Sequence, residues 1–276
     1  IAAGLVGQGS DCLGYDDELS RDHDFGPGCC LWLTDADYEA CGSELASLYA
    51  SLPTEFIGFR RNVQPQGAAR VGVMKISQFY ARFTGCPGTP PNEAAWLRIP
   101  EHFLAAATSG AVFRDDPGEF SRVRESLLPC YPRDVRLKKL AARVFAMAQA
   151  GQYNYPRIVR RGDGPAAMLA LDEFVKAALS ALHLLNRRYL PYYKWAFRSA
   201  RELPRLQQAV RELETLFSAP EAGRQDIIES ICRRVRLALA DDGLSDSGET
   251  FLVPQAQQIM SHIESDYLKH LGVSVG

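Results

Sequence analysis

The stretch from Gly9 to Phe25, GSDCLGYDDELSRDHDF, decides how we interpret the fold of this chain. An apolar run over residues 1–6 leads into it, and a second apolar run over residues 29–33 follows it. The stretch begins with small residues and ends in the acidic pattern Asp22-His23-Asp24. We therefore expect a strand, a loop of small residues, and a second strand that carries two carboxylates.

Asp22 and Asp24 are the candidate catalytic residues and metal ligands. Side chains alternate along a strand, so both carboxylates are expected to point the same way and His23 the other way. Two such charges a few Å apart repel each other by roughly 1 kcal/mol in water and about 4 kcal/mol at an effective dielectric of 20. A divalent cation compensates this repulsion, and Mg²⁺ is typically held by one or two carboxylates together with substrate phosphates. The pair therefore predicts a site for Mg²⁺ (or Mn²⁺).

Gly9 and Ser10 lie where the first strand is expected to end. Small residues allow a phosphate to approach backbone N–H groups closely, and a serine hydroxyl adds a donor. A phosphate cradle beside a carboxylate pair predicts a site for a metal–nucleotide complex.

The pattern formed by Gly9-Ser10, Ser20, Asp22 and Asp24 resembles the signature of the DNA polymerase beta-like nucleotidyltransferase superfamily. In that superfamily a Gly-Ser follows the first strand and an Asp-x-Asp opens the second. The resemblance implies that Asp22 and Asp24 hold the metal, and that Gly9, Ser10 and Ser20 contact the nucleotide.

A longer similarity runs through nearly the whole chain. Residues 14–28 resemble the corresponding sequence in a family of uncharacterised bacterial proteins; after Gly14 they read YDDELSRDHDFGPG. Residues 134–139 and 185–195 resemble the same family. That family joins such a front half to an α-helical back half. The similarity implies an α+β protein, with a small mixed-sheet nucleotidyltransferase domain followed by an α-helical bundle, and it implies a reaction class without a substrate.

Composition bounds the class of protein. The chain has 276 residues, 46% hydrophobic residues and a net charge of −2, which gives no bulk attraction to nucleic acid or to an anionic membrane. No apolar run approaches the ~20 residues that span a bilayer. The seven cysteines are odd in number and contain no Cys-x-x-Cys, so we expect a cytoplasmic protein without a disulfide framework or zinc site. The chain starts at Ile1, inside an expected strand and without a Met, so we expect a segment upstream.

The remaining pattern predicts two domains, residues 1–130 and 131–276. In the first we expect further strands at Phe56–Phe59 and Val71–Ile76, a turn at Asn62–Gly67, and helices at Asp37–Leu52, Ile76–Phe83, Trp96–Ala107 and Glu119–Leu128. In the second we expect six helices in an antiparallel bundle, over residues 134–150, 164–189, 191–203, 204–217, 224–239 and 251–271. Asp134 is expected to cap the first of these helices, and Lys138 and Lys139 are expected on its solvated face.

A third carboxylate is missing from the expected place. Active members of the superfamily carry one on a strand after the Asp-x-Asp strand, but Val71–Ile76 offers only Lys75. Two-metal catalysis needs enough oxygen ligands for both ions. The other candidates are Glu101, Asp115, Asp116 and Glu119, and the sequence does not choose among them.

Cations that offset the triphosphate charge are expected in the helical half, which closes over the nucleotide in related two-domain nucleotidyltransferases. Lys176 lies in the apolar stretch 169–185, where a charge is costly without a partner or a cleft. Tyr193 and Lys194 combine a ring with a cation and suit base stacking with phosphate contact. The competing interpretations are a snorkelling Lys176, and an aromatic interhelical core beside an exposed Lys194.

These observations predict a nucleotidyltransferase that moves a nucleoside monophosphate from a Mg²⁺–NTP complex, with ATP as the expected NTP, to a hydroxyl group. The acceptor is a small molecule, an RNA end or a protein, because this scaffold does not decide among them. Two alternatives stay open. One is a nucleotide-binding regulatory module without activity, favoured by the missing carboxylate. The other is a nucleotidyltransferase-like member of a toxin–antitoxin pair. The pattern does not predict an oligomeric state.

Overall fold

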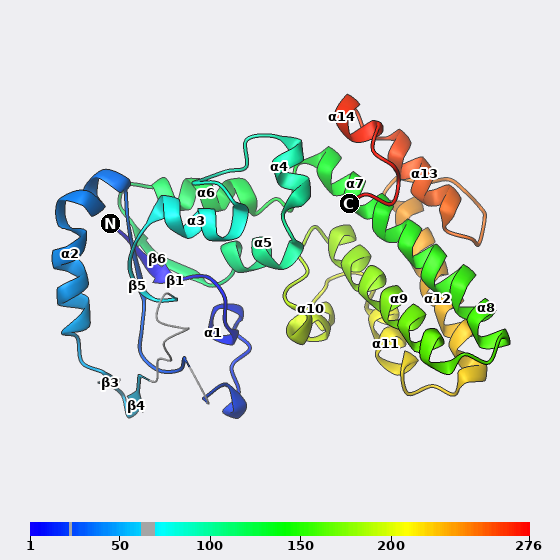
Figure 1. The fold of residues 1–276 in the computed structure, drawn as a ribbon, viewed down its shortest axis with the longest axis horizontal. Coiled ribbons are helices and arrows are strands. Elements are labelled where there is room, and N and C mark those ends of the chain that lie inside the picture. Colours follow the sequence, from blue (N-terminus) through cyan, green and yellow to red (C-terminus); the bar gives the residue numbers. More distant parts are fainter. Residues whose placement is uncertain (22–23, 62–69) are drawn as a thin grey trace. The chain divides into compact units, whose positions relative to one another are not determined.

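The computed structural model describes residues 1–21, 24–61 and 70–276. Asp22, His23 and the expected turn at 62–67 therefore lie outside the described residues. The chain divides into two compact units (Figure 1): residues 1–95 with 99–129 form unit 1, and residues 96–98 with 130–276 form unit 2. The predicted α+β class is confirmed, since a small mixed sheet is followed by a helical C-terminal region.

The sheet of unit 1 has four strands among the described residues, in the order β5-β2-β1-β6. Strand β1 pairs antiparallel with β2 and with β6, and β2 pairs parallel with β5. A parallel pair needs a crossover connection, and helix α2 is part of it here. The bounds are β1 Ala2–Leu5, β2 Cys30–Leu33, β5 Gly72–Lys75, β6 Ala111–Asp115 and α2 Asp35–Ala50.

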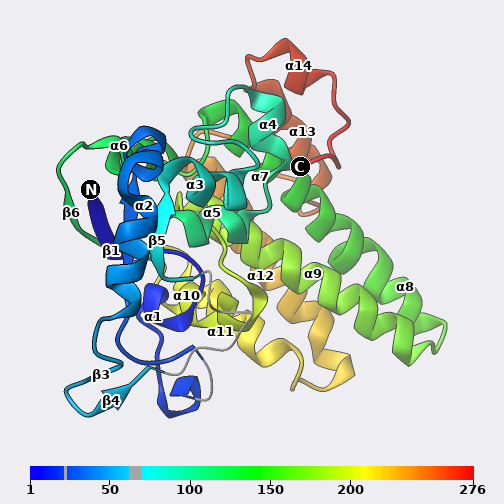
Figure 2. The same cartoon turned by 60° about the vertical axis from the view of Figure 1, so that its left-hand side comes forward.

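One face of the sheet is buried beneath helices (Figure 2). The Trp32 ring of β2 is fully buried and stacks on Phe120 of α6 (Glu119–Leu127), with ring centroids 3.9 Å apart. Phe79 of α3 (Ile76–Thr84) meets the same indole edge-on at 5.3 Å. The Tyr80 hydroxyl donates to the Phe120 carbonyl oxygen at 2.8 Å. This aromatic cluster fixes α3 and α6 against the central strand.

Helix α2 is anchored at both ends. The Thr34 hydroxyl accepts from the Asp37 N–H at 3.1 Å, so Thr34 is the N-cap. Near the other end, the Tyr49 hydroxyl donates to the Cys29 carbonyl oxygen at 2.9 Å. The helix therefore holds the segment that leads into β2.

Two expected elements of unit 1 are wrong in form. Phe56–Phe59 is a hairpin and not one strand: β3 (Glu55–Phe56) and β4 (Phe59–Arg60) are joined by Ile57 and Gly58, whose φ angles of 50° and 77° make a turn. The expected helix Trp96–Ala107 is two helices, α4 (Glu93–Arg98) and α5 (Glu101–Thr108). Pro100 separates them because the residue before a proline is pushed out of the helical region.

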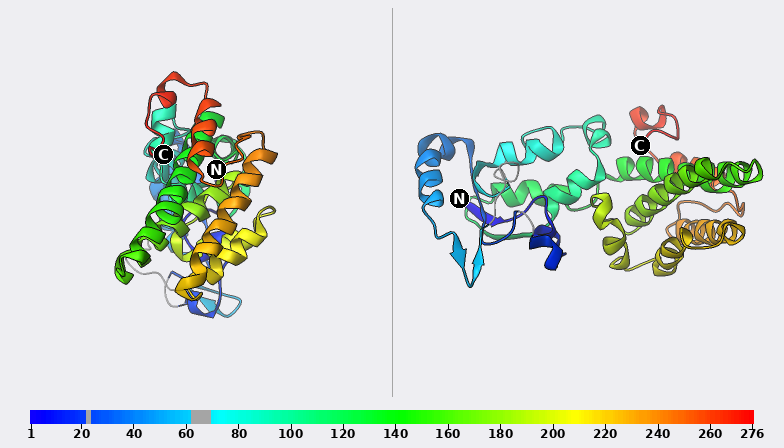
Figure 3. Two further views of the ribbon diagram at one scale, coloured as in Figure 1. Left: turned by 90° about the vertical axis from the view of Figure 1, so that its right-hand side faces the viewer. Right: turned by 60° about the horizontal axis from the view of Figure 1, so that its bottom comes forward.

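Unit 2 is helical throughout its described elements (Figure 3). Helices α7, α9 and α12 run side by side and bury apolar side chains such as Leu140, Phe174 and Ile231. The elements are α7 Arg133–Met147, a π-helical segment Ala148–Asn154, α8 Tyr155–Arg160, α9 Gly164–Leu185, a 3₁₀ turn Tyr193–Trp195, α10 Ala196–Arg201, α11 Gln207–Leu216, α12 Glu221–Asp241, α13 Val253–Ser261 and α14 Asp266–Lys269.

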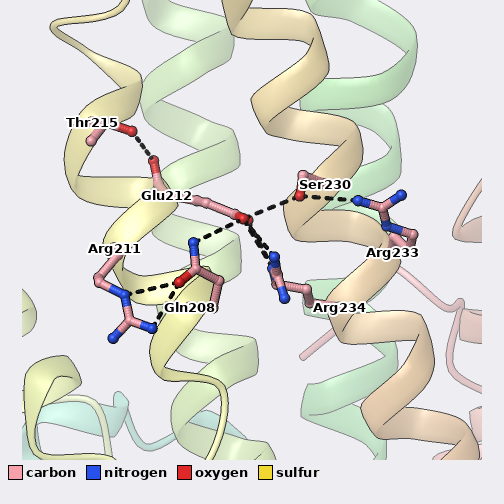
Figure 4. A network of polar contacts seen from close by, with 7 residues as sticks. All are labelled: Gln208, Arg211, Glu212, Thr215, Ser230, Arg233 and Arg234. Atoms are coloured by element: carbon pink, nitrogen blue, oxygen red, sulfur yellow. Dashed lines mark hydrogen bonds and ion pairs between the residues drawn. The ribbon is translucent and has the colours of Figure 1, made fainter.

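A polar network joins α11 to α12 (Figure 4). The Glu212 carboxylate of α11 accepts hydrogen bonds from Arg234 of α12, at 2.9 Å from Nη2 and 3.0 Å from Nε. The Ser230 hydroxyl donates to the same carboxylate at 3.2 Å, and Gln208 does so at 3.4 Å. Burial opposes the charge of Glu212, but these hydrogen bonds lower the pKa of its carboxyl group.

Three expectations for unit 2 are wrong. Lys138 and Lys139 do not lie on a solvated face: they are 0% and 3% exposed, and their ammonium groups donate to backbone carbonyls of Gly272 and Leu97. Asp134 does not cap α7, whose N-cap is Pro132, but accepts from the N–H groups of 264 and 265. The expected helix 251–271 is broken between α13 and α14.

Among the described residues, no helix is both long enough and apolar enough to span a membrane.

Candidate functional site

One edge of the sheet collects the ends of three strands. Gly4 lies opposite Cys30, and Cys30 lies opposite Gly72, so the end of β1 sits beside the starts of β2 and β5. The residues that follow β1, and those that precede β2 and β5, therefore meet at this edge. These residues include Gly9, Ser10, Asp11, Asp24 and Arg70.

Gly9 follows β1 and precedes the short helix α1 (Ser10–Leu13). Its φ of 132° is a conformation that L side chains rarely adopt. A Cβ placed on Gly9 would collide with the guanidinium of Arg70 and with the carboxylate of Asp11. Gly9 follows the first strand as expected, but the expected loop is wrong from Ser10 on, where α1 begins. The backbone at position 9 favours glycine, and a Cβ there would also have to displace two side chains.

Arg70 joins three segments at this edge, and sequence reasoning missed it. Its Nη2 lies 2.6 Å from Asp11 Oδ1, its Nε donates to the Gln8 carbonyl oxygen at 2.9 Å, and its Nη1 donates to the Asp24 carbonyl oxygen at 3.2 Å. The signal was available, because a crossover helix between strands 29–33 and 71–76 makes them parallel. The residue before the second strand then lies at the same edge as Asp24.

Asp24 has a φ of 51°, so the strand alternation expected around it is wrong. Strand β2 begins only at Cys30, and Asp24 sits in the left-handed region that aspartate tolerates better than most residues. The orientation of Asp22 relative to Asp24 lies outside the described residues. Ser20 belongs to a 3₁₀ turn, Glu18–Arg21, where its N–H and hydroxyl both donate to the Asp17 carboxylate at 3.1 Å.

A small hollow opens at this edge and holds about 380 Å³, including the solvent at its mouth. Four charged side chains line it, Asp11, Asp24, Arg61 and Arg70. Arg61 donates from Nε to the Pro27 carbonyl oxygen at 2.8 Å, and its guanidinium stacks over the Tyr49 ring. The hollow therefore combines two carboxylates with two guanidinium groups.

Three of the four candidates for a third carboxylate lie at or just beyond the opposite end of the sheet. Asp115 pairs with Ala2, whereas Ala111 pairs with Leu5 near the hollow. At about 3.3 Å per strand residue, Asp115 is about 10 Å from that edge. Its carboxylate caps α6 by accepting from the N–H groups of Gly118 and Ser121. Asp116 and Glu119 follow Asp115 by one and four residues, and Asp116 pairs with Arg114.

Two further residues discussed in connection with this role, Glu101 and Lys75, do not line the hollow. Glu101 is buried in the first turn of α5 and does not line the hollow. Lys75 ends β5 at the far side of the sheet and pairs with Glu39. Neither β5 nor the described lining of the hollow supplies a carboxylate beyond Asp11 and Asp24.

Three residues of unit 2 were expected to contact the nucleotide, namely Lys176, Tyr193 and Lys194, and the side chains of Lys176 and Tyr193 are largely exposed. Lys176 pairs with Asp172 at 2.6 Å and Glu173 at 3.4 Å, and these carboxylates raise the pKa of its ammonium group. The apolar surroundings expected for Lys176 are therefore wrong, because its face of α9 is the exposed one. Tyr193 is 76% exposed, and the Lys194 ammonium lies 5.0 Å from the Trp195 ring centre.

The residues at the hollow fit a magnesium–phosphate complex in their donor types. Mg²⁺ is usually held by one or two carboxylates plus substrate phosphates, so an all-protein cage is not required. Asp24 lines the hollow and Asp22 is two residues away in the chain. Among the described residues, no group of three or more His, Cys, Asp or Glu side chains has the arrangement of a metal site.

Comparison with known proteins adds one match. A family model described as a domain of unknown function, DUF4037, matches residues 96–196. The matched stretch begins within α4 and ends at Ala196, the first residue of α10. No curated protein and no solved structure matches the chain. The matched residues begin after the stretch from Gly9 to Asp24, so the match carries no information on the chemistry of the hollow.

Proposed function

We propose that this protein transfers a nucleoside monophosphate from a Mg²⁺–NTP complex to a hydroxyl group of an acceptor and releases pyrophosphate. The observation that carries the proposal is the gathering of Gly9, Asp24 and Arg70 at one sheet edge. Glycine allows a phosphate to approach the backbone, the carboxylate suits a metal, and the guanidinium suits phosphate oxygens.

In this reaction the acceptor oxygen forms a bond to the α-phosphorus, and the bond from that phosphorus to the pyrophosphate oxygen breaks. The hydroxyl proton leaves to solvent. Bound Mg²⁺ would neutralise phosphate charge, with Asp24 and Asp22 as its protein ligands. Arg70 and Arg61 place positive charge beside the leaving pyrophosphate, where negative charge increases in the transition state. Positioning and electrostatics supply most of the catalysis in phosphoryl transfer.

The test is a transfer assay with NTP labelled on the α-phosphate, offered to a cell extract as the source of acceptors. We expect the parent chain to label an acceptor and release pyrophosphate. The Asp22→Asn/Asp24→Asn double variant should lose transfer by about 100-fold or more, because the metal would lose its ligands. Equal transfer by parent and double variant would show that the site is assigned wrongly. Asp116→Asn is the matched control, since Asp116 lies at the opposite end of the sheet.

A second candidate is a nucleotide-binding module without transferase activity. The observation in its favour is that β5 carries no carboxylate, and that Asp115 lies at the other end of the sheet. This candidate predicts binding of Mg²⁺–ATP that depends on Asp24, with no pyrophosphate release. Equilibrium binding measured beside the transfer assay separates the two candidates.

A further inference from the structure

The Arg70 guanidinium divides its donors between fixed and exchangeable partners. Nε and Nη1 donate to the backbone carbonyls of Gln8 and Asp24, at 2.9 and 3.2 Å. Nη2 donates to a side chain, the Asp11 carboxylate, at 2.6 Å. A backbone carbonyl moves only with its segment, whereas a side chain leaves by rotation about its own bonds. The contact with Asp11 is therefore the one that can be exchanged while Arg70 stays in place.

This contact covers the backbone of Gly9. The place where a Cβ of Gly9 would stand is occupied by Nη2 of Arg70 and by Oδ1 of Asp11. A phosphate that approaches Gly9 from this side meets the ion pair first. In this conformation the side chains cover the Cβ side of Gly9, while the residue as a whole stays partly exposed.

The ion pair is neither buried nor freely solvated. The side chains of Arg70 and Asp11 are 23% and 29% exposed. Asp11 Oδ1 also accepts from the Cys12 N–H at 2.9 Å, so the carboxylate is held in place by a second donor. Carboxylate and phosphate oxygens compete for the Nη2 donor, and phosphate offers more charge and more acceptor oxygens. A partly exposed pair of this kind is open to displacement by phosphate.

We propose that the ion pair between Arg70 and Asp11 gates the nucleotide site. Asp11 holds the guanidinium over Gly9, and the phosphates of the incoming nucleotide replace Asp11 at Nη2. Arg70 then becomes a phosphate ligand, and the Gly9 backbone is uncovered. The identity of the displacing ligand rests on the proposed function, whereas the exchange at Nη2 rests on the contacts of Arg70.

The gate predicts opposite effects for its two partners on the affinity for Mg²⁺–ATP, measured by titration calorimetry. Asp11→Asn removes the competitor and should tighten binding by about threefold to tenfold. Arg70→Gln removes the phosphate ligand and should weaken binding by about tenfold or more. When Arg70→Gln is already present, Asp11→Asn should raise the affinity for Mg²⁺–ATP no more than the control Asp16→Asn does. Arg70→Lys, which keeps the charge without the fork, should fall between parent and Arg70→Gln.

Asp16→Asn is the matched control for charge. Asp16 is an exposed aspartate five residues away, so this variant removes the same charge without touching Arg70. The gate is overturned if Asp11→Asn weakens binding, or if it changes affinity no more than Asp16→Asn does. Circular dichroism verifies that each variant is folded.

The same variants separate this proposal from the proposed function. If the parent chain does not bind Mg²⁺–ATP, the proposed function fails, and inorganic tripolyphosphate becomes the probe. Binding of tripolyphosphate that needs Arg70 and tightens in Asp11→Asn supports the gate for a different phosphate ligand. If tripolyphosphate also fails to bind, the gate is overturned as well.

Discussion

At the scale of single residues, Gly9 is a position where backbone and space both demand glycine. Its φ is 132°, and a Cβ would collide with Arg70 and Asp11. Gly14, five residues on, also has a positive φ of 70°, but a Cβ there would meet nothing within 4 Å. The two glycines therefore differ in backbone region, φ 132° and ψ 156° against φ 70° and ψ 28°, and also in the space around a Cβ.

We expect Gly14→Ala to cost about 1 kcal/mol in the free energy of unfolding, from the left-handed backbone alone. Gly9→Ala should cost about 2–4 kcal/mol, because its backbone region is nearly closed to L residues and the ion pair over it must also shift. Urea unfolding followed by circular dichroism measures both. Equal losses of stability for the two variants would contradict this prediction.

Lys138 is the second residue with an unusual environment. Its side chain is fully buried in α7, and its ammonium donates to the carbonyl oxygens of Leu271 and Gly272 at 3.0 and 2.6 Å. Burial lowers the pKa of this ammonium to about 8. A charge held mainly by neutral acceptors is costly to bury, and these contacts attach the segment after α14 to α7.

The lowered pKa of Lys138 predicts a stability change with pH. Between about pH 8 and 10.5 the folded chain has released this proton while the unfolded chain still holds it. The unfolded state then binds more protons, so the contribution of Lys138 to stability rises with pH, by up to about 1.4 kcal/mol per unit. We expect the stability of the parent relative to Lys138→Met to increase across this range. Lys176→Met is the control, because carboxylates raise the pKa of Lys176. The prediction would be contradicted if the difference in unfolding free energy between parent and Lys138→Met did not change with pH.

At the scale of residues, the sequence does not predict contacts between side chains that are far apart in the chain. The position of Gly9 after a strand was predicted from its neighbours in the chain. Arg70 and Lys138 depend on partners more than 45 residues away, at Asp24, Asp11 and Gly272. No local pattern encodes these partners. The strand predicted around Asp24 failed because Asp24 has a left-handed backbone and β2 begins only at Cys30.

At the scale of elements, Glu212 ties α11 to α12 through its contacts with Arg234 and Ser230. Only 16% of the Glu212 side chain is exposed, so loss of its charge leaves Arg234 without its carboxylate partner. Glu214, on the same helix, forms a more exposed ion pair with Arg201 and serves as a comparison.

We expect Glu212→Gln to lower the free energy of unfolding at pH 7 by about 1–3 kcal/mol, and Glu214→Gln by less than about 1 kcal/mol. Because the folded pKa of Glu212 is lowered, its contribution is present above the unfolded pKa and is lost as pH falls through the folded pKa. The difference between parent and Glu212→Gln should therefore shrink below about pH 4.5. Thermal unfolding at pH 7 and pH 3.5 measures this difference. If the stability difference between parent and Glu212→Gln does not change with pH, the stabilisation does not come from the charge of Glu212.

Helices and strands were predicted well where a single sequence pattern, such as an apolar run, marks the whole element. The strands β1, β2 and β5 and the helices α2, α3 and α6 follow from apolar runs and from caps such as Thr34. The hairpin β3–β4 was missed because the turn at Ile57-Gly58 lies inside an apolar run, where the pattern resembles one strand. Helical periodicity also continued across the breaks at Pro100 and at 262–265, so it joined helices that are separate.

At the scale of the whole molecule, charge is distributed unevenly along the chain. Residues 1–129 contain 10 Lys and Arg against 17 Asp and Glu, and residues 130–276 contain 21 against 16. The net charge of −2 is therefore the difference between an acidic front part and a basic rear part.

The division predicts unusual behaviour on ion exchangers. At pH 7 and low ionic strength, where the screening length is about 30 Å, each part of the chain is sensed largely by itself. We expect the full chain to be retained on both an anion exchanger and a cation exchanger, and to elute from both as salt rises. A chain of net charge −2 with evenly mixed charges would not be retained on the cation exchanger. That outcome would contradict the prediction.

The π-helical segment Ala148–Asn154 has a consequence for changes in chain length. It connects α7 to α8 and packs Gly151 so tightly that a Cβ there would collide with the Phe174 ring. A π turn contains about one residue more than an α turn, so a helix with such a segment stores a surplus residue. Deleting Gln149 can restore regular winding and keep both flanks in phase. A deletion within α7 would instead rotate every following residue by about 100° around the axis. The molecule thus has a built-in position at which a helix of its core can become shorter and keep its register.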